Sequence, residues 1–311
     1  MSLDPAIKNF LETIKSMNIP PFSQMKVDEV RKLMDNNPIL SPTEPINRKE
    51  DLSFTTNGFE IRMRLYIPEN ATDGLIFYIH GGGFVFGSIE SVEAPVIRLA
   101  NSSKCRVLSV SYRMGPENRF PAALEDVYSS YEWAVKNSTR LGFDAAKIAV
   151  CGDSAGANLA TVLCIKLKEK RETLPRLEIL FYPYVGPDVY SESQREFGEG
   201  FFLTNEDMLW FSTNYLSASR DAFDPYFSPI FYPDLSGMPE TFMITGEHDP
   251  LRDQGQSYLS RLNASGVQTT GIQALGMIHG FVSFINIAPS ARNIVTMIGS
   301  LIAWRLNETP Q

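Results

Sequence analysis

A serine between small residues, in Gly152-Asp153-Ser154-Ala155-Gly156, is the residue best suited to nucleophilic chemistry in this sequence. The apolar run before it is typical of a buried strand, and apolar residues then recur at helical spacing to Leu167. A Gly-x-Ser-x-Gly between a strand and a helix makes a sharp turn that projects the serine hydroxyl. The N-terminus of the following helix favours negative charge at the same point. We therefore predict that Ser154 is a nucleophile.

A run of three glycines, in His80-Gly81-Gly82-Gly83-Phe84, follows another short apolar strand pattern. Consecutive glycines leave backbone N–H groups uncovered, as the stabilisation of an oxyanion requires. Taken alone, the run could equally be a turn that needs positive φ angles. Together with the serine turn it predicts an oxyanion hole formed by the backbone N–H groups of Gly82, Gly83 and Ala155. We expect Asp153 to make structural hydrogen bonds only.

Five segments together resemble the hormone-sensitive-lipase-like carboxylesterases of the α/β-hydrolase fold. In the family's order they are His80-Gly81-Gly82-Gly83-Phe84, Tyr112-Arg113-Met114-Gly115-Pro116-Glu117, Gly152-Asp153-Ser154-Ala155-Gly156, Asp249-Pro250-Leu251-Arg252-Asp253 and His279-Gly280-Phe281. The resemblance implies an α/β fold with a mostly parallel eight-stranded sheet, helices on both faces and a helical cap. It also implies assembly as a homodimer. Ala157, Met114-Gly115 and Leu275 differ from the family's usual residues, but none of these differences removes a reactive group.

The base that activates Ser154 must be one of three histidines. His80 precedes the glycine run, where we expect it to hold the loop in shape. His248 is adjacent to an acidic residue, and adjacent side chains at a strand end diverge. His279 alone follows an acidic residue at the end of a later strand, in the serine–acid–histidine order of this fold. We therefore predict that His279 is the base.

The carboxylate that orients this base lies in the stretch after the strand at 241–246. Glu247, Asp249 and Asp253 all remain candidates on sequence alone. The resemblance points to Asp249, which precedes Pro250. Its expected role is to accept the Nδ1–H of His279 and to stabilise the imidazolium.

The surrounding pattern predicts the elements that position these residues. Two alternating runs at 51–56 and 60–67 flank Asn57-Gly58, which is a strong hairpin signal. Strands and helices then alternate, which predicts a parallel sheet covered on both faces. We expect strands at 75–80, 106–112, 147–151, 177–182, 241–246 and 267–274, and helices near 91–102, 121–138, 155–170, 251–264 and 290–306.

Two segments outside this core are expected to cover the site. Residues 1–45 contain amphipathic helices at about 4–18 and 22–35, which the resemblance assigns to the cap. The connection at 184–225 is too long for a crossover, and its helix near 205–217 begins with a capping-box spacing of Thr204 and Asp207. Its aromatic residues indicate a lid or a satellite hydrophobic cluster, and we favour the lid. The remaining residues, 46–183 and 226–311, are expected to form a single catalytic core.

The aromatic residues of this insertion also suggest a pocket. We expect the substrate to contact Phe84, Tyr184, Phe201, Phe202, Met208, Phe211 and Phe281.

Composition narrows the function further. The 311 residues are 43% hydrophobic and 21% charged, as in a globular protein, and the net charge of −8 argues against binding nucleic acid or anionic membranes. We find no signal-peptide pattern and no apolar run of membrane-spanning length, so we expect a cytoplasmic protein. Cys105, Cys151 and Cys164 lack metal-ligand spacing and are expected to be buried thiols, which suits that compartment. No nucleotide or metal motif is present, so we expect no cofactor and no metal.

These features predict a serine carboxylesterase that acts on small-molecule esters through an acyl-enzyme intermediate. Bulky aromatics and the resemblance favour acyl chains of about two to eight carbons. The alternatives are a non-catalytic receptor on the same fold, or a lipase or amidase with the same triad. A receptor has no need of a base, whereas this sequence retains all three members of the triad.

Overall fold

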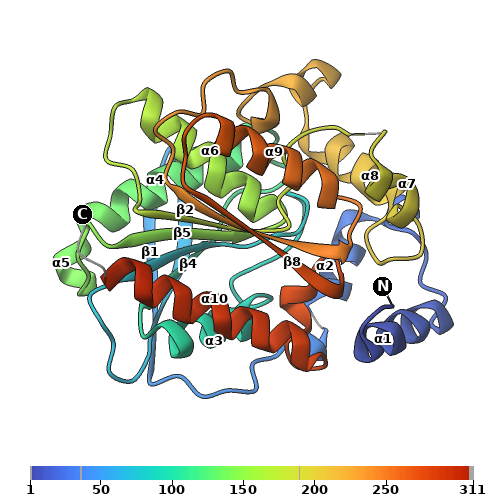
Figure 1. The fold of residues 1–311 in the computed structure, drawn as a ribbon, viewed down its shortest axis with the longest axis horizontal. Helices are drawn as coiled ribbons and strands as arrows, with labels where there is room; N and C mark the ends of the chain where they lie inside the picture. Colours follow the sequence, from blue (N-terminus) through green and yellow to red (C-terminus); the bar gives the residue numbers. More distant parts are fainter. Residues whose placement is uncertain (1, 36, 189, 308–311) are drawn as a thin grey trace.

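The computed structural model describes residues 2–35, 37–188 and 190–307. A mixed sheet of eight strands crosses the molecule in the order β1-β2-β4-β3-β5-β6-β7-β8, with helices on both faces (Figure 1). β1 (Arg48–Thr56) and β2 (Phe59–Ile67) form the antiparallel hairpin at one edge. Asn57 and Gly58 make its turn with φ angles of 49° and 80°. The predicted hairpin and α/β architecture are therefore confirmed.

The predicted catalytic and oxyanion-hole residues follow the carboxyl ends of β3, β5, β7 and β8. β2 pairs antiparallel with β4, and all later pairs are parallel. Every residue of β3, β5 and β6 is buried, as expected where helices cover both faces of a sheet. The strands are β3 (Leu75–Ile79), β4 (Arg106–Val110), β5 (Ile148–Asp153), β6 (Leu177–Phe181), β7 (Glu240–His248) and β8 (Thr269–Ile278).

The crossover helices divide the hydrophobic core into two layers. α3 (Glu93–Ser103) and α10 (Pro289–Asn307) pack together on one face of the sheet (Figure 1). On the other face lie α4 (Ala122–Lys136), α6 (Ala155–Glu169) and α9 (Arg252–Ala264). All five predicted crossover helices are confirmed, and the short α5 (Ser138–Leu141) extends the connection after α4.

The N-terminal segment lies at the same end of the molecule as the long insertion (Figure 1). It contains α1 (Pro5–Ser16), the 3₁₀ turns η1 (Phe22–Gln24) and η2 (Pro38–Leu40), and α2 (Val27–Asp35). The prediction of one helix at 22–35 is wrong, because η1 ends in extended backbone at Met25 before α2 begins. The Glu29 carboxylate accepts the backbone N–H of Lys26 at 3.0 Å, which caps the N-terminus of α2.

The insertion contains one predicted helix and several short elements that were not predicted. The capping box of α8 (Asn205–Tyr215) is confirmed: Asp207 N–H donates to Thr204 Oγ1, and Thr204 N–H donates to the Asp207 carboxylate, both at 3.0 Å. The additional elements of the insertion are α7 (Glu192–Phe197) and η3 (Ser219–Phe223). Outside it, η4 (Pro229–Phe231) precedes β7 and η5 (Phe281–Phe284) follows β8.

Candidate active site

Ser154 occupies a sharp turn between β5 and α6. Its φ and ψ angles are 52° and −117°, a conformation that non-glycine residues rarely adopt and that often marks a functional site. The turn requires glycine on both sides. A β-carbon on Gly156 would overlap the carbonyl oxygen of Ile79, and one on Gly152 would overlap the backbone of Gly156. The Gly-x-Ser-x-Gly pattern is thus a steric requirement of the turn.

The structure brings the side chains of Ser154, His279 and Asp249 into one hydrogen-bonded chain. His279 Nε2 lies 2.9 Å from Ser154 Oγ, and His279 Nδ1 lies 2.9 Å from Asp249 Oδ2. Asp249 follows β7 and is fully buried, and its other oxygen accepts the backbone N–H of Leu251 at 2.7 Å. A hydroxyl, a base and an orienting carboxylate in this order can support nucleophilic attack.

The other two acidic candidates near β7 have different partners. The Glu247 carboxylate accepts the backbone N–H of Gly276 at 2.7 Å. The Asp253 carboxylate accepts the backbone N–H of Ser193 at 2.8 Å and pairs with Arg252. Both carboxylates therefore hold neighbouring loops.

The remaining two histidines also make contacts outside the triad. His80 stacks on Tyr112 with ring centroids 4.3 Å apart, and its Nδ1 lies 2.8 Å from the carbonyl oxygen of Gly81. Burial lowers the pKa of His80 to about 4, so this ring is neutral at pH 7. His248 stacks on Phe201, with centroids 5.7 Å apart and planes 10° apart.

The glycine loop after β3 curls next to Ser154. Gly82 and Gly83 have φ angles of 113° and 60°, and the carbonyl oxygen of Gly82 accepts the N–H groups of Val85 and Phe86, both at 3.0 Å. Gly82, Gly83 and Ala155 line the same cavity as Ser154. Ala155 is the first residue of α6, so its N–H has no acceptor within the helix. The three residues of the predicted oxyanion hole therefore border the same cavity as Ser154.

Asp153 ties this loop to the serine turn. One carboxylate oxygen accepts the Gly81 N–H at 3.0 Å and the Tyr78 hydroxyl at 2.8 Å. Burial raises the pKa of Asp153 to about 6. These contacts agree with the structural role expected for Asp153.

A cavity of about 870 Å³ lies above Ser154 and His279. Five of the predicted pocket residues line it: Phe84, Tyr184, Phe202, Met208 and Phe211. The other two predictions are corrected because tertiary packing turns these rings elsewhere. Phe201 packs on His248, and Phe281 is fully buried against Tyr182, with centroids 5.1 Å apart.

Several lining residues were not predicted as part of the site. Tyr182 follows β6 and its ring lies 4.7 Å from that of His279, centroid to centroid. From the N-terminal segment, the lining includes Phe10, Ile14, Met17, Phe22, Leu33 and Leu40. The apolar face of the predicted first helix was the available signal, but it does not show which surface that face covers.

Two further properties concern what the chain can bind. Within residues 2–35, 37–188 and 190–307, we find no cluster of three or more His, Cys, Asp or Glu side chains that could hold a metal ion. None of the helices in these ranges is both long enough and apolar enough to cross a bilayer.

Comparisons with known proteins identify chains of similar sequence and fold. A family model described as the alpha/beta hydrolase fold matches residues 76–283. An arylesterase of Saccharolobus solfataricus is 34% identical over 307 residues, covering 97% of this chain and 98% of the relative. An ethyl acetate hydrolase of Pseudomonas putida is 32% identical over 311 residues, covering 96% of this chain and 98% of the relative. The structure of a hyperthermophilic esterase from Pyrobaculum calidifontis is similar with a TM-score of 0.93 and 38% identity, covering 98% of this chain and 99% of that one.

Proposed function

The chain belongs to the hormone-sensitive-lipase-like esterases of the α/β-hydrolase fold, and we propose that it is a serine carboxylesterase that uses Ser154, His279 and Asp249. One observation carries the assignment of these residues: His279 lies 2.9 Å from both the serine oxygen and the carboxylate. The alternative of a non-catalytic receptor gains no support from the two relatives described above, an arylesterase and an ethyl acetate hydrolase.

The geometry supports a two-step reaction. His279 Nε2 takes the proton of Ser154 as the hydroxyl oxygen attacks the ester carbonyl carbon. The resulting oxyanion is stabilised by the N–H groups of Gly82, Gly83 and Ala155. His279 then protonates the leaving alcohol, which departs and leaves an acyl-enzyme. In the second step His279 activates water to release the acid.

Asp249 acts on this reaction through the base. Its buried carboxylate accepts the Nδ1–H of His279, which leaves Nε2 free to take the serine proton. The same carboxylate stabilises the imidazolium that forms during each step.

We propose that residues 1–45 and 184–225 together form a cap over the cavity. Both segments line it, and they also contact each other. Ser23 donates to Glu206, and Phe22 packs on Trp210 with centroids 5.9 Å apart. The cap would exclude water from the ester and shape the space for its acyl and alcohol groups.

The substrate is proposed to be an uncharged small-molecule ester with a short or medium acyl chain. The cavity is mostly apolar in its lining, which includes the bulky ring of Phe211 beside Gly83 and that of Phe202 beside Gly280. Initial rates on p-nitrophenyl esters from acetyl to palmitoyl test this proposal. We expect kcat/KM to be highest for acyl chains of about two to eight carbons. A maximum at palmitate would indicate a lipase, and no hydrolysis across the series would exclude the esterase.

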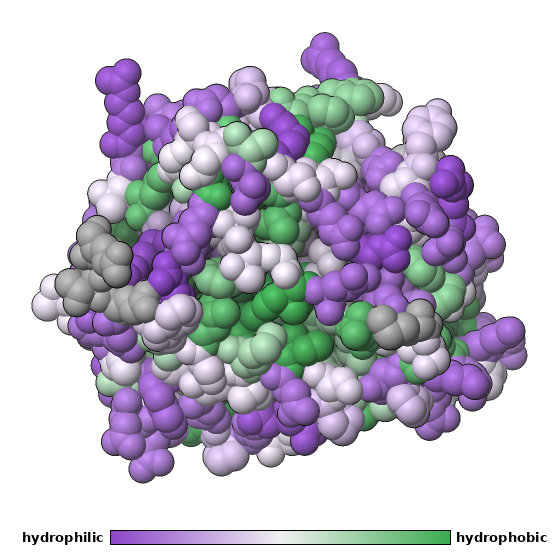
Figure 2. Space-filling model, in the orientation of Figure 1, coloured by the Kyte–Doolittle hydropathy of each residue, from purple (hydrophilic) through white to green (hydrophobic). Residues whose placement is uncertain are grey.

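We also propose a homodimer through β8, the last strand of the sheet. Figure 2 shows hydrophobic residues gathered near the middle of the face on which Figure 1 displays β8 and α10. Leu275 of β8 is 54% exposed and Met297 of α10 is 45% exposed. Sedimentation analysis should show a dimer that Leu275→Glu dissociates; a wild-type monomer would contradict the proposal.

A cytoplasmic location is proposed on the basis of the thiols. Cys105, Cys151 and Cys164 are free and buried, which suits a reducing compartment. Cell fractionation tests it, and recovery of the protein outside the cytoplasm would contradict it.

A further inference from the structure

One arginine of the proposed cap reaches the backbone of the glycine loop after β3. This loop, residues 80–87, is called the oxyanion loop below. Arg31 lies on α2, and its Nε donates to the carbonyl oxygen of Val85 at 2.9 Å. Its Nη2 donates to the carbonyl oxygen of Gly115 at 2.8 Å. Both terminal nitrogens also bind the carboxylate of Glu117, at 2.9 and 2.8 Å. A single guanidinium therefore joins α2 to two backbone segments of the core.

These two segments are themselves connected at the oxyanion loop. Val85 lies two residues after Gly83, and its N–H closes the turn on the carbonyl oxygen of Gly82. The N–H of Gly115 donates to the carbonyl oxygen of Phe84 at 2.9 Å. Arg31 thus supports the loop directly at Val85 and indirectly through Gly115.

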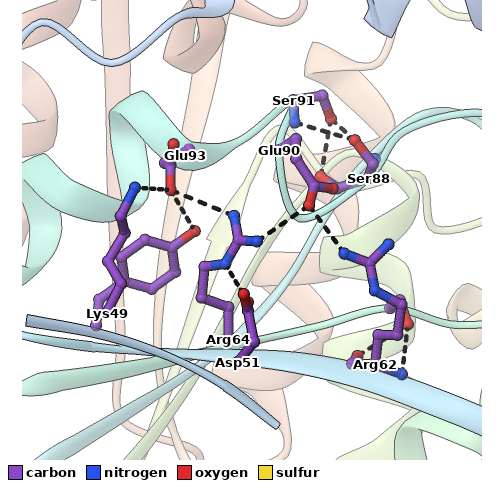
Figure 3. Close-up of polar contacts among 10 residues, drawn as sticks. Lys49, Asp51, Arg62, Arg64, Ser88, Glu90, Ser91 and Glu93 are labelled. Carbon is purple, nitrogen blue, oxygen red and sulfur yellow. Dashed lines mark hydrogen bonds and ion pairs between the residues drawn. The ribbon is translucent and has the colours of Figure 1, made fainter. Parts of the chain in front are cut away.

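The two ends of the loop are held by groups that do not involve Arg31. At its start, Asp153 binds Gly81. Beyond its end, Ser88 and Ser91 exchange hydrogen bonds, and Glu90 accepts from Arg62 at 3.0 Å (Figure 3).

The same network continues into the edge hairpin (Figure 3). Glu93 binds Lys49 at 3.0 Å and Arg64 at 3.4 Å, and Arg64 also binds Asp51. The middle of the loop, at Phe84 and Val85, is therefore the part that Arg31 holds.

We propose that Arg31 is a positioning residue, which sets the backbone geometry of the oxyanion hole from the cap. The inference rests on the ester hydrolysis proposed above. Donors in an oxyanion hole act only when they are held at the place where charge develops, and a displacement of about 1 Å can cost about a hundredfold in rate. The cap then contributes to the rate of the chemical step as well as to the walls of the pocket.

The chemistry of the contact requires a guanidinium. Its planar fork can bind a carboxylate with two nitrogens while it also donates to Val85 and Gly115. The single ammonium of a lysine cannot span all three acceptors. Arg31→Lys should consequently keep the charge of the cap and still lower kcat, though by less than Arg31→Ala does.

Three variants test this role: Arg31→Ala, Arg31→Lys and the matched control Asn286→Ala. Asn286 also holds the N-terminal segment to the core by donating to two backbone carbonyls, those of Ile39 and Ser41, both at 2.8 Å. These contacts lie outside residues 80–87. The variants are compared by kcat and KM on p-nitrophenyl butyrate, and by inhibition with a trifluoromethyl ketone, which forms an oxyanion on the serine.

Arg31→Ala should lower kcat by about ten- to a hundredfold with KM changed by less than about threefold. The inhibition constant of the ketone should rise by the same factor by which kcat/KM falls. Arg31→Lys should be intermediate in kcat, and added ethylguanidinium should restore part of the rate of Arg31→Ala. Asn286→Ala should retain the wild-type kcat.

Wild-type kcat in Arg31→Lys would overturn the inference, and so would an effect of both Arg31 variants on KM alone. An equal loss of kcat in Asn286→Ala would also overturn it, because any loosening of the N-terminal segment would then suffice. The wild-type rate in the same assay separates the two proposals. An inactive wild type refutes the esterase, whereas an active wild type with unaffected Arg31 variants refutes only the role of Arg31.

Discussion

Phe211 packs its ring directly against Gly83. A β-carbon added to Gly83 would overlap this ring, and the φ angle of Gly83 is 60°. Phe211 belongs to α8 of the insertion, whereas Gly83 belongs to the loop after β3, and both line the cavity. The proposed lid and the proposed oxyanion hole are therefore in contact close to the nucleophile.

Gly83→Ala should lower kcat by about a hundredfold, because the new methyl group displaces either the loop or the ring. Adding Phe211→Ala should recover part of the loss, since the overlap disappears while the strain of a positive φ remains. Rates of the two single variants and the double variant form the cycle that measures this coupling. Strictly additive losses would show that the ring does not transmit the effect.

The assignment of the base is tested at two histidines. His279→Ala should lower kcat by at least about a thousandfold, because members of a triad act as a unit. His248→Ala should change kcat by less than about threefold, since this ring stacks on Phe201. The reverse pattern, with both variants folded by circular dichroism, would move the role of base to His248.

Asp249→Asn should keep the shape of the buried side chain and lower kcat by several orders of magnitude. An amide that donates to Nδ1 would leave the proton of His279 on Nε2. This nitrogen could then not accept the proton of Ser154. Glu247→Gln is the matched control, since that carboxylate binds Gly276 instead. A near-normal rate in Asp249→Asn would exclude this aspartate as the orienting acid.

The sequence predicted the features that depend on local sterics. Gly152 and Gly156 are required by overlap with neighbouring backbone, so the serine turn was recognisable from residue type alone. The hairpin turn was also recognisable from residue type, because Asn57 and Gly58 both adopt positive φ angles there. Strand and helix positions followed from periodicity, because each element buries a continuous face.

Features that depend on distant partners were not predictable in this way. Glu247, Asp249 and Asp253 are so close in sequence that only the packing of the loops after β7 and β8 separates their roles. Phe201 was placed in the pocket, yet it stacks on a histidine 47 positions further along the chain. The contact of Arg31 with Val85 joins segments 54 positions apart, and no local pattern reveals it.

A buried glutamate in the core gives a prediction about stability. Glu178 lies in β6 and is fully buried, and Thr241 Oγ1 donates to it at 2.9 Å. Burial raises its pKa from the ordinary value of 4.5 to about 7. The folded state therefore binds more protons than the unfolded state between these two values. The stability that the protonated Glu178 side chain contributes is therefore lost as the pH rises through this window.

Glu178→Gln should remove this dependence. We define the difference as the free energy of unfolding of the variant minus that of the wild type. This difference should increase by up to about 3 kcal/mol between pH 4.5 and pH 7, because each pH unit contributes about 1.4 kcal/mol. Urea unfolding at constant ionic strength measures the difference. A difference that is constant or decreases with pH would contradict the raised pKa.

The role of Ser154 as the nucleophile is tested by the initial rate of p-nitrophenyl butyrate hydrolysis by Ser154→Ala. Removing the hydroxyl eliminates the nucleophile, while a buried turn that already accommodates small residues should keep its fold. We expect a rate below about a hundredth of that of the wild type, with an unchanged circular dichroism spectrum and a similar melting temperature. A folded Ser154→Ala protein that hydrolyses the ester above that rate would contradict the serine mechanism.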